Sequence, residues 1–417
     1  MTKKNAFYAQ SGGVTAVINA TACGVIETAR KNTGRIGKVF AGLNGIVGAL
    51  AEELVDTSCE SDESIGALRH TPGGAFGSCR LKLAEPDVDR RAFDRLIEVF
   101  RAHDIGYFFY NGGGDSADTC LKIANYAAAL GYPLQAIHIP KTIDNDLPFT
   151  DNCPGFGSVA KYVAISALEC SLDVRAMSRT SSRVFILEVM GRHAGWVAAA
   201  GGLAADHGIP LVILFPEISF DEDRFLARVA QNVERYGYCS VVASEGCRYP
   251  DGRFLADQGA KDAFGHTNLG GAAPVLANMV RTRLGLPLQW AVAGYLQRSA
   301  RHLASAVDVR QAYELGCEAV GLGLAGHNAV MPTIERLSDE PYEYRLGMAD
   351  LKDIANVEKH MPGNFISEDG FGITDACRRY LLPLIQGEDY PPYLDGVPQY
   401  VRLQNVLVQR RLEPFVF

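Results

Sequence analysis

Residues 105–116 read IGYFFYNGGGDS. The first six residues form a short apolar and aromatic run, which predicts a buried β-strand. Three consecutive glycines follow, and Asp115 and Ser116 then open a predicted helix that continues to about Ala129. Glycines leave room for a phosphate to approach the backbone N–H groups at a helix start, where anions bind favourably. Asp and Ser also suit the N-cap of a helix, so the same residues can be purely structural.

The same unit of strand, loop and helix recurs along much of the chain. Predicted strands cover residues 5–10, 39–43, 105–110, 134–139, 184–190, 211–215 and 240–244. Predicted helices cover residues 17–31, 88–102, 116–129 and 221–236. This alternation predicts mostly parallel sheets with helices on both faces, and ligands bound at the carboxyl ends of the strands. This alternation of strands and helices ends at about residue 350, and we expect helix and loop in the tail that follows.

The composition is that of a folded protein without an excess of positive charge. The 417 residues carry 40 Lys and Arg against 48 Asp and Glu, a net charge of −8, which argues against nucleic acid or anionic membranes as partners. No apolar stretch has the roughly 20 residues of a membrane span, and no signal-peptide core is present. The 10 cysteines form no CxxC pair, so we expect neither a zinc ribbon nor a disulfide framework, and a cytoplasmic location.

Two further strand ends carry small loops that suit anionic ligands. Gln10-Ser-Gly-Gly13 opens a predicted helix and can bind an anion through its backbone N–H groups, or it can be a tight turn. Met190-Gly-Arg192 places an arginine after a strand, where it can meet a sugar or a phosphate, although a lone arginine there is more often part of a structural ion pair. Gly321–Gly326 matches GxGxxG by letter, but it follows a predicted helix over residues 307–320, so we interpret it as a helix-ending turn.

The loop Lys141-Thr-Ile-Asp-Asn-Asp146 is the most informative of the strand-end loops. Its carboxylates, Asp144 and Asp146, stand two residues apart, and Lys141 precedes the first by three residues. This combination can supply a general base, a magnesium ligand and a phosphate clamp, which are the parts that phosphoryl transfer needs. An Asx-rich turn is the commoner explanation of Asp-Asn-Asp when that tripeptide is taken alone.

Taken in order, these loops resemble the motifs of the phosphofructokinase family over roughly residues 5–330. The matching motifs are SGG at 11–13, GGGDS at 112–116, PKTIDND at 140–146, EVMGR at 188–192, SEG at 244–246 and YLQR at 295–298. Within the family, Asp115 and Lys141 resemble the pyrophosphate-using group, since the ATP-using members have glycine at both positions. The resemblance implies that the Asp115 carboxylate repels the α-phosphate of ATP and that Lys141 steadies the transferred phosphoryl group.

The resemblance also implies the fold and its division into domains. The expected fold is α/β, with two Rossmann-like three-layer domains, mostly parallel sheets, an active site in the cleft between the domains, and a helical C-terminal extension. The phosphoryl-donor domain would comprise residues 1–155 with about 297–349. The sugar-phosphate domain would comprise residues 156–296, and the extension residues 350–417.

Roles for individual residues follow from the same resemblance. Pyrophosphate is expected to bind Gly12, Gly13, Arg80, Gly113 and Lys141. Catalysis is expected of Asp144 as the general base, together with Lys141, Asp115 and Asp146. Fructose 6-phosphate is expected to contact Thr142, Asp144, Arg183, Met190, Gly191, Arg192, Glu245, Tyr295 and Arg298, with Arg183 supplied by the same or a neighbouring subunit. Magnesium is the expected cofactor, held by Asp146 and the backbone of Gly114.

The implied reaction is the reversible transfer of a phosphoryl group from pyrophosphate to fructose 6-phosphate, in glycolysis and gluconeogenesis, by a homodimer or homotetramer. Two positions depart from the family pattern. Gly114 stands where many relatives have an aspartate that binds magnesium, and Gln289 stands where bacterial ATP-using members have a phosphate-binding arginine. Two alternatives remain open: an ATP-dependent 6-phosphofructokinase, and a catalytically inactive sugar-phosphate sensor.

Overall fold

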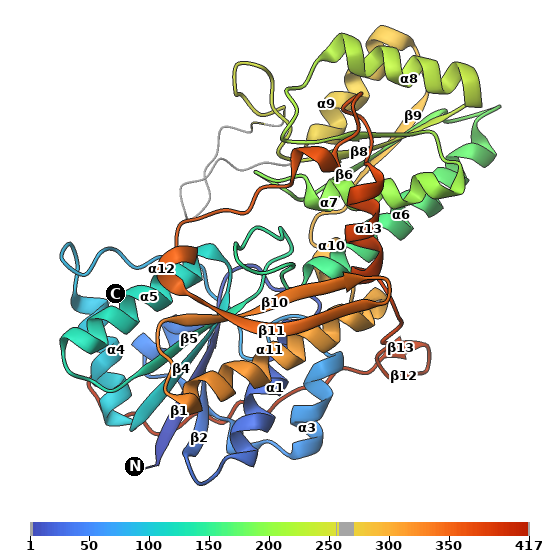
Figure 1. The fold of residues 1–417 in the computed structure, drawn as a ribbon. Coiled ribbons are helices and arrows are strands. Elements are labelled where there is room, and N and C mark those ends of the chain that lie inside the picture. The colour runs from blue at the N-terminus through green and yellow to red at the C-terminus, as the bar shows by residue number, and fades with distance from the viewer. Residues whose placement is uncertain (1–2, 256, 258–270, 416–417) are drawn as a thin grey trace. The chain divides into compact units, whose positions relative to one another are not determined.

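A computed structural model describes residues 3–255, 257 and 271–415 (Figure 1). The chain forms two compact units. Unit 1 comprises Met1–Gly155, Arg301–Lys359 and Gly387–Phe417, and unit 2 comprises Phe156–Ala300 and His360–Gln386. The C-terminal residues 350–417 are therefore divided between the two units. Among the residues described, no helix is long and apolar enough to cross a membrane.

Unit 1 is built on a seven-stranded sheet with the strand order β11-β10-β5-β4-β1-β2-β3. Neighbouring strands run parallel except at the two edges, where β3 and β11 are antiparallel to their neighbours. The strands are β1 Lys4–Gln10, β2 Ile36–Gly42, β3 Leu54–Asp56, β4 Ile105–Gly112, β5 Gln135–Pro140, β10 Val330–Asp339 and β11 Tyr342–Asp350. A separate small hairpin joins β12 Tyr393–Leu394 to β13 Val397–Pro398.

Helices cover both faces of this sheet because alternate residues of its central strands point to opposite sides. Phe108 and Tyr110 pack with α4 and α5, whereas Tyr107 and Phe109 pack with α1 and α11, as the two helical layers in Figure 1 show. All eight residues of β4 are buried, which explains the continuous apolar run in the sequence. The helices are α1 Ile18–Lys31, α2 Ile46–Leu50, α3 Asp62–Ala67, α4 Arg91–Ala102, α5 Gly114–Ala129, α11 Ala306–Ala325 and α12 Leu351–Ile354.

Unit 2 has a four-stranded parallel sheet with the order β7-β8-β6-β9. Helices α8 and α9 supply apolar side chains to one face of the sheet, and α6 and α7 contact the other. The strands are β6 Val184–Val189, β7 Leu211–Leu214, β8 Cys239–Ser244 and β9 Leu288–Val292. The helices are α6 Phe156–Met177, α7 Trp196–Ala200, α8 Glu222–Tyr236, α9 Ala272–Met279, α10 Leu296–Ser299 and α13 Asp375–Leu384.

The expected fold class is confirmed, and apart from the helix predicted over residues 307–320 the predicted elements begin and end within three residues of the observed ones. Helix α6 was not predicted because its buried residues do not form one narrow stripe. The antiparallel pair β10–β11 was not predicted either, and it adds two strands to the sheet of unit 1. The turn expected over Gly321–Gly326 is wrong in extent: α11 continues to Ala325, and only Gly326, with φ 88°, ends it in the left-handed conformation.

Candidate functional site

Three of the loops singled out in the sequence begin side by side at one edge of the sheet of unit 1. Strands β1, β4 and β5 are parallel neighbours, with Gln10 opposite Asn111 and Gly112 opposite Pro140. The loops that follow these strands therefore start at the same edge. In parallel α/β sheets this carboxyl edge is the usual place for a ligand.

Lys141, which begins the loop after β5, forms hydrogen bonds to the loop after β1 and to the end of β4. Its ammonium nitrogen donates a hydrogen bond to the carbonyl oxygen of Gly13 at 2.7 Å, and its backbone N–H donates to Gly112 at 3.0 Å. Gly12 has φ 77°, a left-handed conformation, and a Cβ there would lie 3.4 Å from the Lys141 nitrogen. The structure thus places a buried positive charge directly against the glycine loop after β1.

Arg80 follows a segment that runs alongside the same glycine loop. Cys79 forms a parallel bridge with Ser11, and its carbonyl oxygen accepts from the Gly12 N–H at 2.9 Å. The Ser78 hydroxyl donates to the Gly12 carbonyl oxygen at 2.7 Å. These contacts bring the exposed Arg80 to the loop, although it lies far from that loop in the sequence.

Asp115 lies in the first turn of α5, immediately after Gly113 and Gly114. Its carboxylate accepts a hydrogen bond from the ammonium group of Lys82 at 2.8 Å, and both side chains are about half exposed. Lys82 was not predicted, because its only signal in the sequence is its position two residues after Arg80. The pair leaves a carboxylate and a cation beside the glycine-rich loop after β4.

The turn after β5 carries the two candidate catalytic carboxylates. The Thr142 hydroxyl accepts from the backbone N–H of Asp144 at 3.1 Å, which starts the turn. Asn145 then adopts φ 56°, and its side-chain oxygen accepts from the Cys153 N–H at 2.9 Å. Asn tolerates this left-handed conformation better than most residues. Asp144 is left partly exposed, with its carboxylate next to the Thr142 hydroxyl.

Asp146 offers one oxygen that suits a cation. Its Oδ1 atom is buried and accepts no hydrogen bond from the residues that the structure describes, and burial raises the pKa of this carboxyl. At Gly114 an added Cβ would meet no atom within 4 Å, so this position provides space but no side-chain ligand. No cluster of three or more His, Cys, Asp or Glu side chains suited to a metal occurs in the described part of the chain. Mg²⁺ usually takes one or two carboxylates plus substrate phosphates, so the residues present fit that ion.

In unit 2, the loops after β6 and β8 contact each other through hydrogen bonds. Val189 and Ser244 are opposite each other in parallel strands, and the Glu245 N–H donates to the Val189 carbonyl oxygen at 2.9 Å. The Ser244 hydroxyl donates to the Gly191 carbonyl oxygen. A Cβ at Gly246 would lie 2.2 Å from the Arg192 carbonyl oxygen, so only glycine permits this approach.

The Glu245 side chain belongs to the same pair of loops. It accepts a hydrogen bond from the Gly191 backbone, and burial raises the pKa of its carboxyl. Together the two loops hold Met190, Gly191, Arg192 and Glu245 at the carboxyl edge of the sheet of unit 2.

A residue that was not predicted, Gln297, joins the segment Tyr295–Arg298 to these loops through a hydrogen bond. The buried Gln297 accepts from the Met190 N–H at 3.2 Å and donates to the Gly294 carbonyl oxygen at 2.9 Å. Gln297 occupies one of the two variable positions of the motif Tyr-x-x-Arg. Its place inside that motif is therefore the one sequence signal for its role. Beside it, the Arg298 guanidinium lies 3.9 Å from the centre of the Tyr295 ring.

Within unit 2, Arg183 is not brought to the loop that carries Met190, Gly191 and Arg192. It precedes β6, whereas Met190–Arg192 follows that strand, so the two lie at opposite ends of it. Its guanidinium donates to the carbonyl oxygens of Gly237 and Val233, at 3.2 and 3.4 Å, where α8 ends. Gln289 lies toward the same end of the sheet, opposite Phe185.

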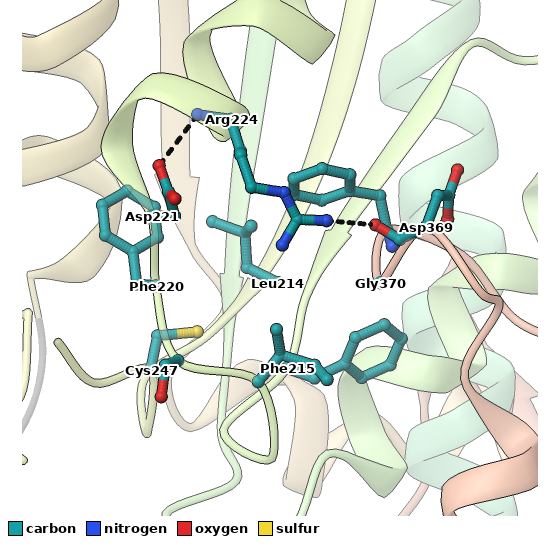
Figure 2. A pocket seen from close by; sticks show the side chains of 11 residues that line it. Leu214, Phe215, Phe220, Asp221, Arg224, Cys247, Asp369 and Gly370 are labelled. Carbon is teal, nitrogen blue, oxygen red and sulfur yellow. Dashed lines mark hydrogen bonds between the residues drawn. The ribbon is translucent and has the colours of Figure 1, made fainter. Parts of the chain in front are cut away.

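A small pocket in unit 2 involves the C-terminal tail rather than any predicted site residue (Figure 2). The Arg224 guanidinium donates to the Asp369 carbonyl oxygen at 3.1 Å and lies over the ring of Phe371. The Phe371 carbonyl oxygen accepts from the Ile213 N–H at 2.9 Å, beside β7. The pocket has a volume of only about 20 Å³, which is too small for a sugar phosphate, so these contacts serve to hold the tail on unit 2.

Comparison with known proteins extends over the whole chain. The phosphofructokinase family profile matches residues 5–322. A pyrophosphate–fructose 6-phosphate 1-phosphotransferase of Methylococcus capsulatus is 65% identical over 414 residues, or 99% of each chain. A protein of the same name from Halomonas elongata is 63% identical over all of both chains. The crystal structure of a pyrophosphate-dependent phosphofructokinase from Nitrosospira multiformis is 63% identical, covers all of both chains and has a TM-score of 0.93.

Proposed function

The chain belongs to the phosphofructokinase family, and from that premise we infer that it transfers a phosphoryl group from pyrophosphate to the C1 hydroxyl of fructose 6-phosphate. The products are fructose 1,6-bisphosphate and phosphate, and the reversible reaction serves glycolysis and gluconeogenesis. The observation that carries this conclusion is similarity over the full length. Three relatives named for this reaction share 57–65% of their residues with the chain over at least 99% of both sequences.

Pyrophosphate binding is assigned to the carboxyl edge of the sheet in unit 1. The backbone around Gly12, Gly13 and Gly113 and the start of α5 can offer N–H groups to phosphate oxygens. The Lys141 ammonium group, 2.7 Å from the Gly13 carbonyl oxygen, and the nearby Arg80 add positive charge. These cations stabilise the charge that develops on the phosphoryl group and on the departing phosphate.

Asp144 is assigned as the general base. Its carboxylate takes the proton of the C1 hydroxyl while that oxygen forms its bond to phosphorus, and the bridging P–O bond breaks to release phosphate. The hydrogen bond from the Asp144 N–H to the Thr142 hydroxyl fixes the turn that presents this carboxylate. Support for the role comes from this fixed backbone and from the partial exposure of the side chain, which leaves it accessible to a substrate.

We assign magnesium binding to the Asp146 oxygen that accepts no hydrogen bond and to the backbone at Gly114, with phosphate oxygens of the substrate as further ligands. When bound, the ion neutralises charge on the transferred phosphoryl group. The ion would then stand beside the one Asp146 oxygen to which no described residue donates a hydrogen bond.

Fructose 6-phosphate recognition is assigned to hydroxyl-binding and phosphate-binding groups. Glu245 and the backbone at Gly191 suit the sugar hydroxyls, because the Ser244 and Gly246 contacts fix both. The stacked side chains of Tyr295 and Arg298 suit the 6-phosphate, which a guanidinium binds well. The remaining assignments to this substrate are Thr142, Asp144, Met190 and Arg192.

We propose that Arg183 reaches the 6-phosphate of a neighbouring copy in a homodimer or homotetramer. Two observations support this role. Arg183 stands at the end of β6 opposite to Met190–Arg192, so it does not join that loop within one chain. Among the described residues, β9 pairs only with β6, so it is an edge strand, and it carries two exposed apolar side chains, Trp290 at 44% and Val292 at 43%.

Mixing two inactive variants tests whether Arg183 acts across subunits. Asp144→Asn and Arg183→Ala are expected to have little activity when each is produced alone. A dimer containing one copy of each then has one complete site, so random pairing is expected to restore about a quarter of the wild-type rate. The rate of fructose 1,6-bisphosphate formation by the co-produced, co-purified variants is the measurement. Activity no greater than the sum of the two parents would show that Arg183 acts within its own chain.

A further inference from the structure

Lys359 lies against the turn that carries Asp144 and Asp146, although it belongs to the C-terminal tail. Its ammonium group is buried, and it donates to the carbonyl oxygen of Asp151 at 2.8 Å and to that of Thr150 at 3.1 Å. It also reaches the side-chain oxygen of Asn145 at 3.4 Å. The backbone N–H of Lys359 donates to the Asp146 carbonyl oxygen at 2.6 Å.

These contacts suit a lysine in particular. An ammonium group has three N–H donors, and oxygens of Asn145, Thr150 and Asp151 lie within hydrogen-bond distance of this one. A buried charge is tolerated only when its donors are satisfied and opposite charge is near. Burial lowers the pKa of Lys359, whereas the neighbouring carboxylates of Asp151 and Asp146 oppose that shift.

The residues that Lys359 contacts lie near both ends of the segment from Asp144 to Asp151. Asn145, between the two carboxylates, is held at φ 56°, a conformation that costs free energy in any residue other than glycine. Thr150 and Asp151 follow a few residues later, where the loop turns back. One side chain therefore contacts the beginning and the end of the segment, while the Lys359 backbone holds Asp146, next to Asn145.

We propose that Lys359 is a positioning residue for phosphoryl transfer, which holds the turn from Asp144 to Asp151 so that the carboxylates of Asp144 and Asp146 keep their orientation toward the substrates. The proposal rests on the proposed function, in which Asp144 is the base. A displacement of about 1 Å in a reacting group can reduce a rate by up to a hundredfold. Because Lys359 does not itself touch the substrates in this scheme, its removal should affect the rate more than it affects binding.

The first test replaces Lys359 with methionine, which keeps the length of the side chain and removes its donors. We expect kcat to fall about thirtyfold, while the KM values for pyrophosphate and fructose 6-phosphate stay within about threefold of the wild type. The matched control is Arg95→Met. Arg95 is also a buried cation of unit 1, and its Nε atom donates to the Leu50 carbonyl oxygen at 3.0 Å, but it lies on α4. The control should lower the melting temperature and leave kcat unchanged.

A second variant separates positioning from folding. Asn145→Gly removes the oxygen that accepts from both Lys359 and the Cys153 N–H, and it relaxes the left-handed backbone without strain, so it should fold even if Lys359→Met does not. We expect Asn145→Gly to lower kcat about tenfold, because the turn loses its fixed conformation. If both residues act through the same turn, the double variant should be little slower than Lys359→Met alone.

The possible outcomes are distinct. A folded Lys359→Met protein with kcat within twofold of the wild type, or with no greater loss than Arg95→Met, overturns the proposal. So does a double variant whose loss is the product of the two single losses. If Lys359→Met does not fold, an unchanged kcat in Asn145→Gly overturns it. A wild-type protein that fails to use pyrophosphate contradicts the proposed function instead, and that result is visible before any variant is measured.

Discussion

Replacing Asp144 with asparagine is expected to lower kcat about a thousandfold, while the affinity for fructose 6-phosphate stays within about threefold. Asparagine has nearly the same shape as aspartate, and the backbone contact of residue 144 with the Thr142 hydroxyl does not involve the carboxylate. The turn should therefore keep its form. What is lost is the group that accepts the C1 proton, and that loss matters only once the hydroxyl begins to attack phosphorus.

The measurement combines steady-state rates with calorimetric titration of fructose 6-phosphate. Asp56→Asn is the matched control, because Asp56 is a buried carboxylate of unit 1 that pairs with Lys38 and ends β3, outside the turn after β5. We expect this control to lose stability and to keep kcat within about threefold. A thousandfold weaker sugar affinity in Asp144→Asn, or a rate close to that of the wild type, would contradict the role of Asp144 as base.

Replacing Asp115 with glycine is expected to change the ratio of kcat/KM for pyrophosphate to kcat/KM for ATP by about a hundredfold, in favour of ATP. Two unit charges about 4 Å apart repel each other by about 4 kcal/mol at an effective dielectric constant near 20. Because Asp115 is 41% exposed and pairs with Lys82, we expect about half of that repulsion to act on the α-phosphate of ATP. Removing this repulsion alone corresponds to about a thirtyfold increase in kcat/KM for ATP.

The value of kcat/KM for pyrophosphate should fall as well, and this fall supplies the rest of the hundredfold change in the ratio. With glycine at position 115, residues 112–115 would all be glycine, and the loop would be less ordered around the donor. Asp104→Gly is the matched control. Asp104 also pairs with a lysine, Lys4, but it lies before β4, at the other end of the strand from this loop. An unchanged donor ratio in Asp115→Gly would rule out the exclusion of ATP by this carboxylate.

Much of the fold could be predicted because its central strands are buried on both faces. The run at β4 is apolar and aromatic from Ile105 to Tyr110 and ends in glycines, so the strand, the loop and the next helix are all evident locally. Helix α6 lacks such a signal, since its small apolar residues face more than one neighbour. The end of α11 was also not evident locally. Gly323 lies within this helix, where it packs against Tyr107 and Phe109, and does not end it.

The candidate site was predictable where its residues follow strands in recognisable motifs, as Lys141 and Asp144 do. Residues that support the site from elsewhere gave no local signal. Lys359 stands 214 residues after Asn145 in the sequence, and nothing in the tail indicates that its ammonium group lies against that turn. Lys82 and Gln297 were missed for a similar reason, because hydrogen bonds formed in the folded chain define their roles.

The phosphoryl donor is the central claim, and initial rates of the wild-type protein with fructose 6-phosphate and magnesium test it most directly. We expect rapid formation of fructose 1,6-bisphosphate with pyrophosphate, and a rate at least about a hundredfold lower with ATP at the same concentration. Formation of the bisphosphate with pyrophosphate would also exclude an inactive sugar-phosphate sensor. Turnover with ATP and none with pyrophosphate would contradict the account.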